Sequence, residues 1–418
     1  MPRVHAEQVR AICLEEGAAG AGFVEAGRAA LGEEREAHRI VFPAVRSLVS
    51  LMVRLNPENM QAPPRHFAND ETQQGVKHLQ VVARRILARL NALGVRGVVA
   101  PVSFPMDMHR WPGKLWDVSH KPIAVEAGLG HMGIHRSVIH PEFGSFVLLE
   151  TLLIDAEFDA YGQPLGAAPC MECLLCVSAC PVGAISAAGP FDSSACLTHN
   201  YREFLGGFQD WVETLVESPG PRDYRERVSD QETLSWWQSL AHGPSYKSSY
   251  CIAVCPAGEE LKGPWLLDRA AYVEKTVRPL RERAEPVYVV AGTPAEAAAA
   301  RHPNKTVRRV RNPVRLRSVS GYLEGLRRVP EQRLARLAFR IDLEFTGAES
   351  LRAALEVRDG ALRVGEFGAG AADGVLRADA RTFVDLLNGE TRLWRARLAR
   401  RLRYRGDRAA LFALFALR

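Results

Sequence analysis

The sequence contains no hydrophobic run long enough to cross a membrane. A membrane helix needs about 20 consecutive apolar residues, and even the apolar stretch "GSFVLLETLLIDA" carries Glu150 and Asp155. The first residues, "MPRVHAEQVRAICLEEG", lack both the basic and apolar segments of a secretory signal and a twin arginine. We therefore expect a cytoplasmic protein with no membrane partner.

Cysteine is scarce outside one segment. Of the eight cysteines, seven fall between Cys170 and Cys255, which excludes the even spread of a secreted disulfide framework and indicates a metal site in a reducing compartment. The remaining one, Cys13, lies on the apolar face of a predicted helix and is expected to pack in the core.

Aromatic residues are scarce where positive charge is concentrated. Residues 301–340 contain twelve Lys or Arg against two acidic residues, a local charge of +10 within a chain of net charge +6. From Arg308 to Arg328 the one aromatic residue is Tyr322, and single-stranded nucleic acids need aromatic stacking partners. We therefore expect a solvated basic linker here and no nucleic-acid partner.

What is present indicates a globular chain of several domains. The 418 residues are 47% hydrophobic and 24% charged, enough for two or three domains of roughly 100 to 200 residues each. Periodicity predicts helices over 7–16, 260–286 and 378–389, strands over 45–55, 95–104, 286–292 and 334–347, and a hairpin at Asp359-Gly360. This mixture of predicted helices and strands indicates an α+β or α/β fold.

The run "CMECLLCVSACP" has the spacing of iron–sulfur ligands. Two residues separate each successive pair among Cys170, Cys173 and Cys176, a spacing that lets one tight loop wrap a cluster. Cys180, followed by Pro181, is expected to reach a second cluster. In "SSYCIAVCPAG", Cys255 returns to complete the first cluster. A zinc site is the alternative.

The second cluster then has three cysteines, which are Cys180, Cys196 and Cys251. A full second motif would place another cysteine where Ser248 stands. Ser248, water or another side chain as fourth ligand, or a three-iron cluster, are the open alternatives. We thus predict two iron–sulfur clusters, the first a 4Fe-4S centre.

An upstream motif, "SHKPIAVEAGLGHMGIHRSVIHPEFGSF", together with the cysteines resembles the epoxyqueuosine reductase family, and more closely its shorter Ser-His-Lys relatives. That family is distantly related to reductive dehalogenases. The resemblance covers about residues 1–265 and implies an α/β domain that holds base-off cobalamin beside a ferredoxin-like two-cluster module. The positions that match are Ser119, His120, Lys121, Ala127, Gly128, Leu129, Gly130, Gly133, Pro141, Glu142, Gly144 and the seven cysteines.

Three glycines of this box are expected to contact a cofactor. Gly128, Gly130 and Gly133 have no Cβ atoms, which allows the backbone to approach a flat or bulky group such as a corrinoid edge. A tight turn with no ligand is the alternative.

The sequence departs from the family in ways that affect catalysis. His131, Ile134 and His135 stand where the family has Trp and Lys-Asn. The family's Val-Asp-Ser/Thr-x-Pro element, which carries the proton-donating Asp, has no match. Asp117 is the nearest acid, with His120 and Lys121 as further catalytic candidates and His109 as another proton source.

The last hundred residues resemble the sterol carrier protein type two domain. The resemblance rests on "LRADARTFVDLLNG" and on Gly406-Asp407 before an apolar helix, and it implies a five-stranded sheet with an apolar tunnel. The domains predicted are 1–165, the α/β domain; 166–265, the cluster module; 266–319, a helix and basic linker; and 320–418, the sterol-carrier-like α+β domain.

We interpret the chain as an oxidoreductase that passes low-potential electrons through two clusters to a corrinoid or directly to a small, apolar substrate. Electrons would come from reduced ferredoxin or flavodoxin, because no nucleotide motif is present. The C-terminal domain would present the substrate or mediate a homodimer. The alternative function is a non-catalytic electron-transfer or lipid-binding adaptor without corrinoid.

Overall fold

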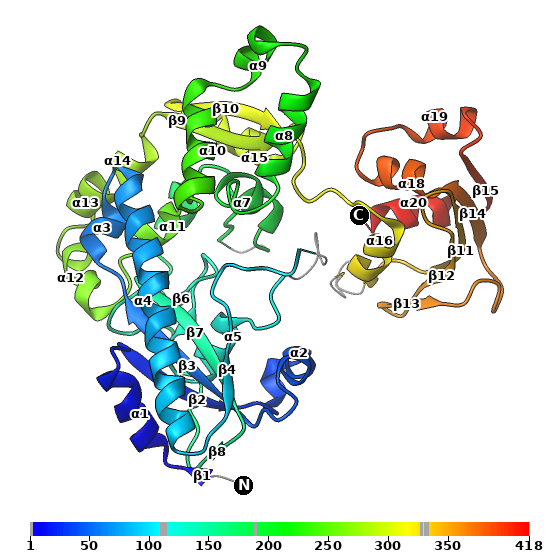
Figure 1. The fold of residues 1–418 in the computed structure, drawn as a ribbon. Coiled ribbons are helices and arrows are strands. Elements are labelled where there is room, and N and C mark those ends of the chain that lie inside the picture. Colours follow the sequence, from blue (N-terminus) through cyan, green and yellow to red (C-terminus); the bar gives the residue numbers. More distant parts are fainter. Residues whose placement is uncertain (1–2, 109–114, 188–189, 327–328, 330–333, 418) are drawn as a thin grey trace. The chain divides into compact units, whose positions relative to one another are not determined.

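The computed structural model describes residues 3–108, 115–187, 190–326, 329 and 334–417. The chain divides into two compact units, the first formed by residues 1–106 and 116–313 and the second by 107–115 and 314–418. Figure 1 shows helices and strands mixed in both units, as expected for the predicted fold class. Within the described residues, no helix is both long and apolar enough to cross a membrane.

The first unit begins with a four-stranded antiparallel sheet in the order β2-β3-β7-β4. The elements of this part are β1 (Arg3–Val4), α1 (Ala6–Glu15), β2 (Gly20–Glu25), η1 (Ala29–Leu31), α2 (Glu34–Val41), β3 (Ser47–Arg54), α3 (Pro57–Gln61), α4 (Arg65–Ala92), β4 (Gly97–Val99), α5 (His120–Glu126), β5 (His131–Met132), β6 (Val138–Ile139), β7 (Val147–Ile154) and β8 (Glu157–Phe158). The strands predicted over 45–55 and 95–104 are confirmed, although the second is short.

Both faces of this sheet are covered. The side chains of β3 and β7 alternate, so that Val49, Leu51 and Leu152 pack under α1 and α4, as Figure 1 shows for the long α4. Leu48 and Leu153 face α5 on the other side. Cys13 is fully buried in the α1 layer, which confirms its predicted packing role. The sheet therefore fixes the position of α5, which carries the Ser-His-Lys motif at its start.

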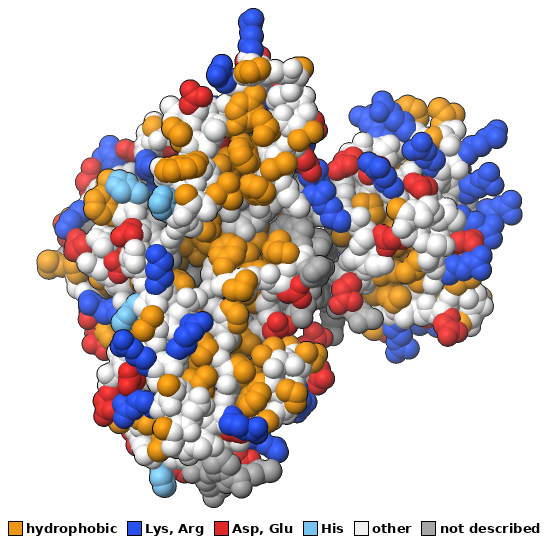
Figure 2. Space-filling model, viewed as in Figure 1, with side chains coloured by type: hydrophobic (Ala, Val, Ile, Leu, Met, Phe, Trp, Pro, Cys, Tyr) orange, Lys and Arg blue, Asp and Glu red, His pale blue; other side chains and the backbone are white. Residues whose placement is uncertain are grey.

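The cysteine segment and the following hundred residues form short helices and one small βαβ unit. These elements are α6 (Leu175–Ala179), α7 (Ser193–His199), α8 (Gly207–Glu217), α9 (Pro221–Arg227), α10 (Asp230–His242), α11 (Tyr250–Ala253), α12 (Glu259–Leu267), α13 (Arg269–Tyr272), η3 (Val273–Val277), α14 (Arg278–Arg281), β9 (Glu285–Val290), α15 (Pro294–Ala299) and β10 (Lys305–Val310). Figure 2 shows hydrophobic side chains over α8 and α10, where Val216 and Leu240 are exposed.

The stretch 266–319 differs from a simple helix and linker. β9 and β10 pair in parallel across α15, and the buried Lys305 ammonium lies 2.6 Å from the Glu285 carboxylate. Tyr250 of α11 donates a hydrogen bond of 2.5 Å to the same carboxylate. Lys305, Arg308 and Arg309 therefore belong to a strand, and Lys305 and α11 of the cysteine segment share the Glu285 carboxylate.

The second unit contains a five-stranded sheet in the order β13-β12-β11-β14-β15, with helices on its buried face. Its elements are α16 (Val319–Leu326), β11 (Phe339–Thr346), β12 (Leu351–Arg358), β13 (Ala361–Gly365), β14 (Gly374–Asp379), α18 (Ala380–Leu387), α19 (Leu393–Leu398), β15 (Leu402–Gly406) and α20 (Arg408–Ala416). The predicted hairpin at Asp359-Gly360 joins β12 to β13, and both residues have positive φ, as such a turn requires. The five-stranded sheet expected from the resemblance is confirmed.

Candidate metal centre

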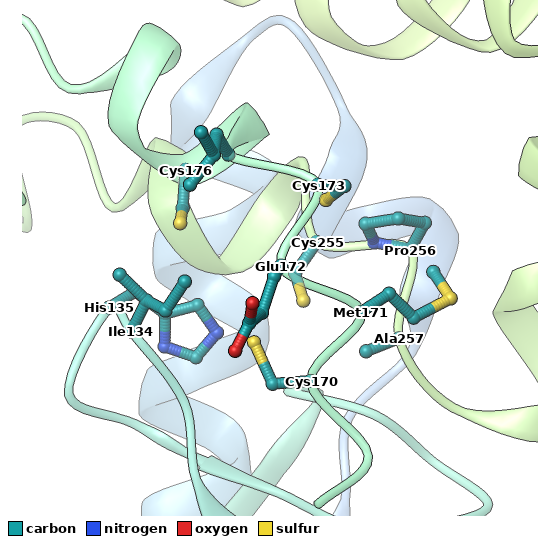
Figure 3. A pocket seen from close by; sticks show the side chains of 11 residues that line it. Ile134, His135, Cys170, Met171, Glu172, Cys173, Cys176, Cys255, Pro256 and Ala257 are labelled. Atoms are coloured by element: carbon teal, nitrogen blue, oxygen red, sulfur yellow. The ribbon is translucent and has the colours of Figure 1, made fainter. Parts of the chain in front are cut away.

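Four cysteines meet in one pocket of the first unit. Cys170, Cys173, Cys176 and Cys255 line it together with His135. Figure 3 shows their sulfur atoms around a common space, with the His135 ring at its edge. These are the four ligands that the sequence predicts for the first cluster, and the fold brings them together from two segments about 80 residues apart.

The loop around this pocket has the backbone shape that a cluster requires. Glu172 and Leu174 have φ angles of 49° and 60°, a left-handed conformation that non-glycine residues seldom adopt and that concentrates at functional sites. It allows the N–H of Leu175 to donate to Cys173, and the N–H of Ala257 donates to Cys255. Backbone N–H groups that point at sulfur stabilise the negative charge of a bound cluster.

The thiols of this pocket are poorly suited to remain without metal. Burial, followed by the neighbouring thiols of Cys251 and Cys255, raises the pKa of Cys176 to about 12. A metal ion replaces the thiol proton and compensates the buried negative charge. The donor set therefore fits a cation-rich group such as an iron–sulfur cluster.

Among the residues that the structure describes, no three His, Cys, Asp or Glu side chains are placed to hold a single metal ion. A tetrahedral zinc site needs its sulfur ligands about 2.3 Å from one centre. A 4Fe-4S cluster binds each thiolate at a different iron, so its sulfur ligands surround a larger body. The four cysteines line one pocket without converging on a single point, so the pocket fits a cluster better than zinc.

The other three cysteines form a second group beside the first. The pKa values of both Cys196 and Cys251 are raised to about 12, chiefly by burial and then by neighbouring thiols, including Cys180 in both cases. Cys180 accepts a hydrogen bond of 3.3 Å from the backbone N–H of Ala184. Because the thiol of Cys251 also acts on Cys176, the two groups adjoin each other.

Ser248, the candidate fourth ligand of the second group, is held by Asn200. Its hydroxyl donates to the Asn200 side-chain oxygen at 3.1 Å, and its backbone N–H donates to the same oxygen at 3.1 Å. The N–H of Ser249 adds a third bond of 2.7 Å. An alkoxide bound to iron has no proton to donate, so ligation by Ser248 would break its bond to Asn200.

Lys121 lies near the second cysteine group and near His135. The negative charges of Cys251 and Cys196 oppose the effect of burial, which lowers the pKa of Lys121. The same ammonium lowers the pKa of His135 beside the first pocket, although burial is the larger cause there. Lys121 Nζ donates a hydrogen bond of 2.7 Å to the Arg136 carbonyl. Protein atoms surround the side chain, but it stays open to solvent at the surface. Lys121 is thus the predicted catalytic residue that interacts with the second cysteine group and with His135 at the first pocket.

The remaining proton-donor candidates are placed differently. His120 begins α5, where its two ring nitrogens lie 3.0 Å from Thr151 Oγ1 and 3.1 Å from the Pro101 carbonyl oxygen, and burial lowers its pKa. Asp117 is half-buried three residues earlier. His109 lies outside the described residues. A catalytic role for Asp117, His120 or Lys121 stays a prediction.

The glycine box is packed against the protein itself. A Cβ atom at Gly130 would lie 2.6 Å from the Ile139 carbonyl oxygen, and one at Gly128 would lie 2.6 Å from that of Gln163. A Cβ at Gly133 would lie 2.9 Å from the His135 ring. These contacts explain the three glycines without a ligand and do not form a cradle for a corrinoid. Their cofactor-binding role stays a prediction.

The structure adds a hydrogen-bond relay that sequence reasoning missed. His135 Nδ1 accepts from the Ser137 N–H at 3.1 Å, so Nε2 carries the proton and donates to Ser145 Oγ at 3.0 Å. The Ser145 hydroxyl donates to Cys255. All three side chains of this relay are buried. In the sequence, the unusual His135 after the glycine box was a signal of this relay, but nothing in the sequence pointed to Ser145.

An aromatic cluster beside the second cysteine group was also missed. Phe204 stacks on Tyr246 with ring centroids 4.5 Å apart and on Phe104 at 5.7 Å. Cys196 raises the pKa of Tyr246, after burial as the main cause, which places this ring near the group. These residues lie in three separate segments, so no local pattern relates them.

Comparison with known proteins agrees with this division of the chain. Residues 323–417 match the SCP-2 sterol transfer family. The epoxyqueuosine reductase of Bacillus anthracis is 27% identical over 142 residues, which are 34% of this chain and 30% of that protein. The chain thus joins a region similar to epoxyqueuosine reductases to a region similar to SCP-2 sterol transfer proteins. Both resemblances noted in the sequence are confirmed.

The solved structures that are similar to part of this chain include epoxyqueuosine reductases and reductive dehalogenases. The epoxyqueuosine reductase of Streptococcus thermophilus matches with 16% identity and a TM-score of 0.38 over 65% of this chain and 74% of its own. A catabolic reductive dehalogenase matches with 15% identity and a TM-score of 0.41 over 71% of this chain and 35% of its own. The sequence match spans under a third of the length of the Bacillus anthracis relative.

Proposed function

We propose that this protein is a reductase that passes low-potential electrons through two iron–sulfur clusters to an acceptor near Lys121. The observation that carries the proposal is the adjoining placement of two cysteine groups, with Cys176 of the first near Cys251 of the second. Two clusters so placed would exchange single electrons directly. The general class, an iron–sulfur reductase, agrees with the relatives found for the chain.

Each cluster has an assigned set of ligands in this proposal. Cys170, Cys173, Cys176 and Cys255 hold a 4Fe-4S cluster, and Cys180, Cys196 and Cys251 hold the second centre. Clusters of this kind reach roughly −400 mV or below. The electron donor would be a reduced ferredoxin or flavodoxin.

The acceptor is a corrinoid or the substrate itself. A bound corrinoid would supply a strongly reducing cobalt centre, but the glycine box does not form a cradle for it. Lys121 would hold an anionic or electron-rich acceptor by charge and donate a proton to the reduced product. His120, fixed between Thr151 and the Pro101 carbonyl, would position the start of α5 and with it Lys121.

Anaerobic purification followed by iron, sulfide and cobalt analysis tests this proposal. We expect about seven or eight irons per chain and an EPR signal from two interacting clusters after reduction. Added cobalamin that binds and gives a cobalt signal without axial nitrogen splitting identifies the acceptor as a corrinoid. Two clusters without cobalamin uptake point to direct reduction of a substrate or to an electron-transfer adaptor.

Substitution at Lys121 separates a reductase from an adaptor. Lys121→Met removes the charge and the proton but keeps the length of the side chain, whereas Lys121→Arg keeps the charge. We expect both variants to retain iron and the reduced EPR signal. A reductase loses reoxidation by its acceptor in the first variant and retains part of it in the second, while an adaptor shows equal rates in both.

A further inference from the structure

The C-terminal unit carries an unusually one-sided concentration of charge. Between Arg392 and Arg408 the sequence contains eight arginines, no lysine and a single acid, Asp407. This segment includes α19, β15 and the start of α20, and Figure 2 shows basic side chains gathered over this end of the unit. We call residues 392–408 the α19 basic face.

The eight arginines are exposed and unneutralised. All of them are exposed to solvent, and none forms an ion pair with a residue that the structure describes. The Asp407 carboxylate instead caps α20 by accepting from the Ala409 N–H at 2.9 Å. Elsewhere in the unit arginines are paired, as Arg352 and Arg377 are with Glu344. The charge of the α19 basic face is therefore available to an anionic partner.

Large apolar side chains stand among these arginines. Trp394 and Leu398 are 56% and 78% exposed, and residues four apart lie on the same face of a helix. The Arg395 guanidinium lies over the Trp394 ring, 5.3 Å from its centroid, within the roughly 6 Å of a cation–π contact. The buried Ala396 faces the core and fixes the orientation of α19.

We propose that the α19 basic face docks on the surface of a membrane that contains anionic phospholipids. Arginines would contact the headgroup phosphates, while Trp394 and Leu398 would enter the boundary between headgroups and acyl chains, as apolar residues of interfacial helices do. A strongly exposed aliphatic residue such as Leu398 favours lipid over RNA, because bases stack on aromatic rings and not on leucine. Docking of this kind needs no spanning segment, so it is compatible with the absence of one from the described residues.

Vesicle binding by the full-length chain tests this inference. The probes are vesicles of phosphatidylcholine alone and of phosphatidylcholine with phosphatidylglycerol, used in flotation assays at low and high salt. We expect binding to the anionic vesicles only, and weaker binding as salt screens the arginines. Tryptophan fluorescence should shift to shorter wavelength on binding, and this shift should shrink in Trp394→Phe.

Two variants with equal charge change locate the surface. Arg395→Gln/Arg397→Gln is expected to weaken binding to anionic vesicles by roughly tenfold or more, since each basic residue near such a surface contributes to attraction. The matched control, Arg352→Gln/Arg377→Gln, removes two arginines that are already paired with Glu344 and is expected to change binding little. Leu398→Ser should weaken binding without a change in charge.

Three results would overturn the inference. One is equal binding to neutral and anionic vesicles, and another is equal loss of binding in both double variants. The third is salt-sensitive binding to RNA, lost in Arg395→Gln/Arg397→Gln, with no binding to vesicles. The inference is independent of the proposed function, because none of these assays requires iron or electron transfer.

Discussion

At the scale of single residues, Ser145 connects an unusual histidine to a cluster ligand. Its hydroxyl accepts from His135 and donates to Cys255, and such bonds to cluster sulfur favour the reduced, more negative state. We expect Ser145→Ala to lower the midpoint potential of the first cluster by roughly 40 mV, since a hydrogen bond is worth about 1 kcal/mol and 59 mV corresponds to a factor of ten for one electron. An EPR-monitored redox titration measures it.

Ser137→Ala is the matched control for this substitution. Only the backbone N–H of Ser137 contacts His135, and that group is retained in the variant. Its potential should therefore equal that of the unmodified protein. Equal potentials in Ser145→Ala and Ser137→Ala would show that the relay does not act on the cluster.

Ser248 decides the composition of the second centre. Asn200 holds its hydroxyl, so we expect three protein ligands there. Ser248→Cys should supply the fourth thiolate and raise the iron content by about one per chain if the native centre has three irons. Ser248→Ala, which removes the hydroxyl alone, should leave iron content and EPR spectra unchanged. Iron loss in Ser248→Ala would identify serine as a ligand.

The sequence was informative about residues whose spacing reflects their chemistry. The cysteines follow from the geometry of a loop around a cluster, and the fold brings the predicted groups together. His135, Ser145 and Asn200 have no such spacing, because their partners are chosen by the fold. The glycine box was less informative. A glycine is required wherever a Cβ would clash, and the clashing neighbour can be a cofactor or, as here, the Ile139 carbonyl.

At the scale of elements, strand β7 carries a buried acid. Neither carboxylate oxygen of Glu150 has a hydrogen-bond partner in the structure, and burial raises its pKa to about 8, opposed only by Arg84 of α4. The unfolded chain loses this proton near pH 4.5. Between these values the folded state holds more protons, so stability falls by about 1.4 kcal/mol per pH unit as pH rises and then levels off above about pH 8.

Glu150→Gln removes this pH dependence. The variant is neutral at every pH, so its gain in unfolding free energy should grow from near zero at pH 4.5 to roughly 4 kcal/mol at pH 8. Urea unfolding at several pH values measures it. The exposed Glu157 on β8 provides the control, since Glu157→Gln should leave the pH profile unchanged. Parallel profiles for the unmodified protein and Glu150→Gln would contradict the argument.

Elements whose sequence follows one periodicity were predictable. Segments that divide into several short elements, or whose structure depends on pairing with a distant strand, were not. The strands in the first sheet and the β12–β13 hairpin follow from alternation and turn chemistry. The predicted helix over 260–286 is divided into α12, α13, η3 and α14, with Pro264 inside α12 and Pro279 in the first turn of α14. Strand β10 was hidden because its arginines read as a charged linker, whereas pairing with β9 determines its structure.

At the scale of the whole molecule, the two units have separate stabilising interactions. All seven cysteines proposed as cluster ligands lie in the first unit. The core of the second unit is formed by residues 319–417 around its own sheet. A group that binds only the folded state of one unit stabilises that unit and not the other. The two units should therefore respond differently to loss of iron.

Calorimetry before and after iron removal tests this separation. We expect two unfolding transitions, and chelation should lower the one that belongs to the first unit by at least about 5 °C, since 1 kcal/mol corresponds to roughly 2–4 °C in a domain of this size. The transition of the second unit should not move. To assign it, Phe383→Ala, which removes a fully buried ring from the second core, should lower only that transition, by an amount consistent with about 3–5 kcal/mol. If chelation and Phe383→Ala instead lower a single common transition, the two units fold as one cooperative body, and the clusters stabilise the sterol-carrier-like unit as well as their own.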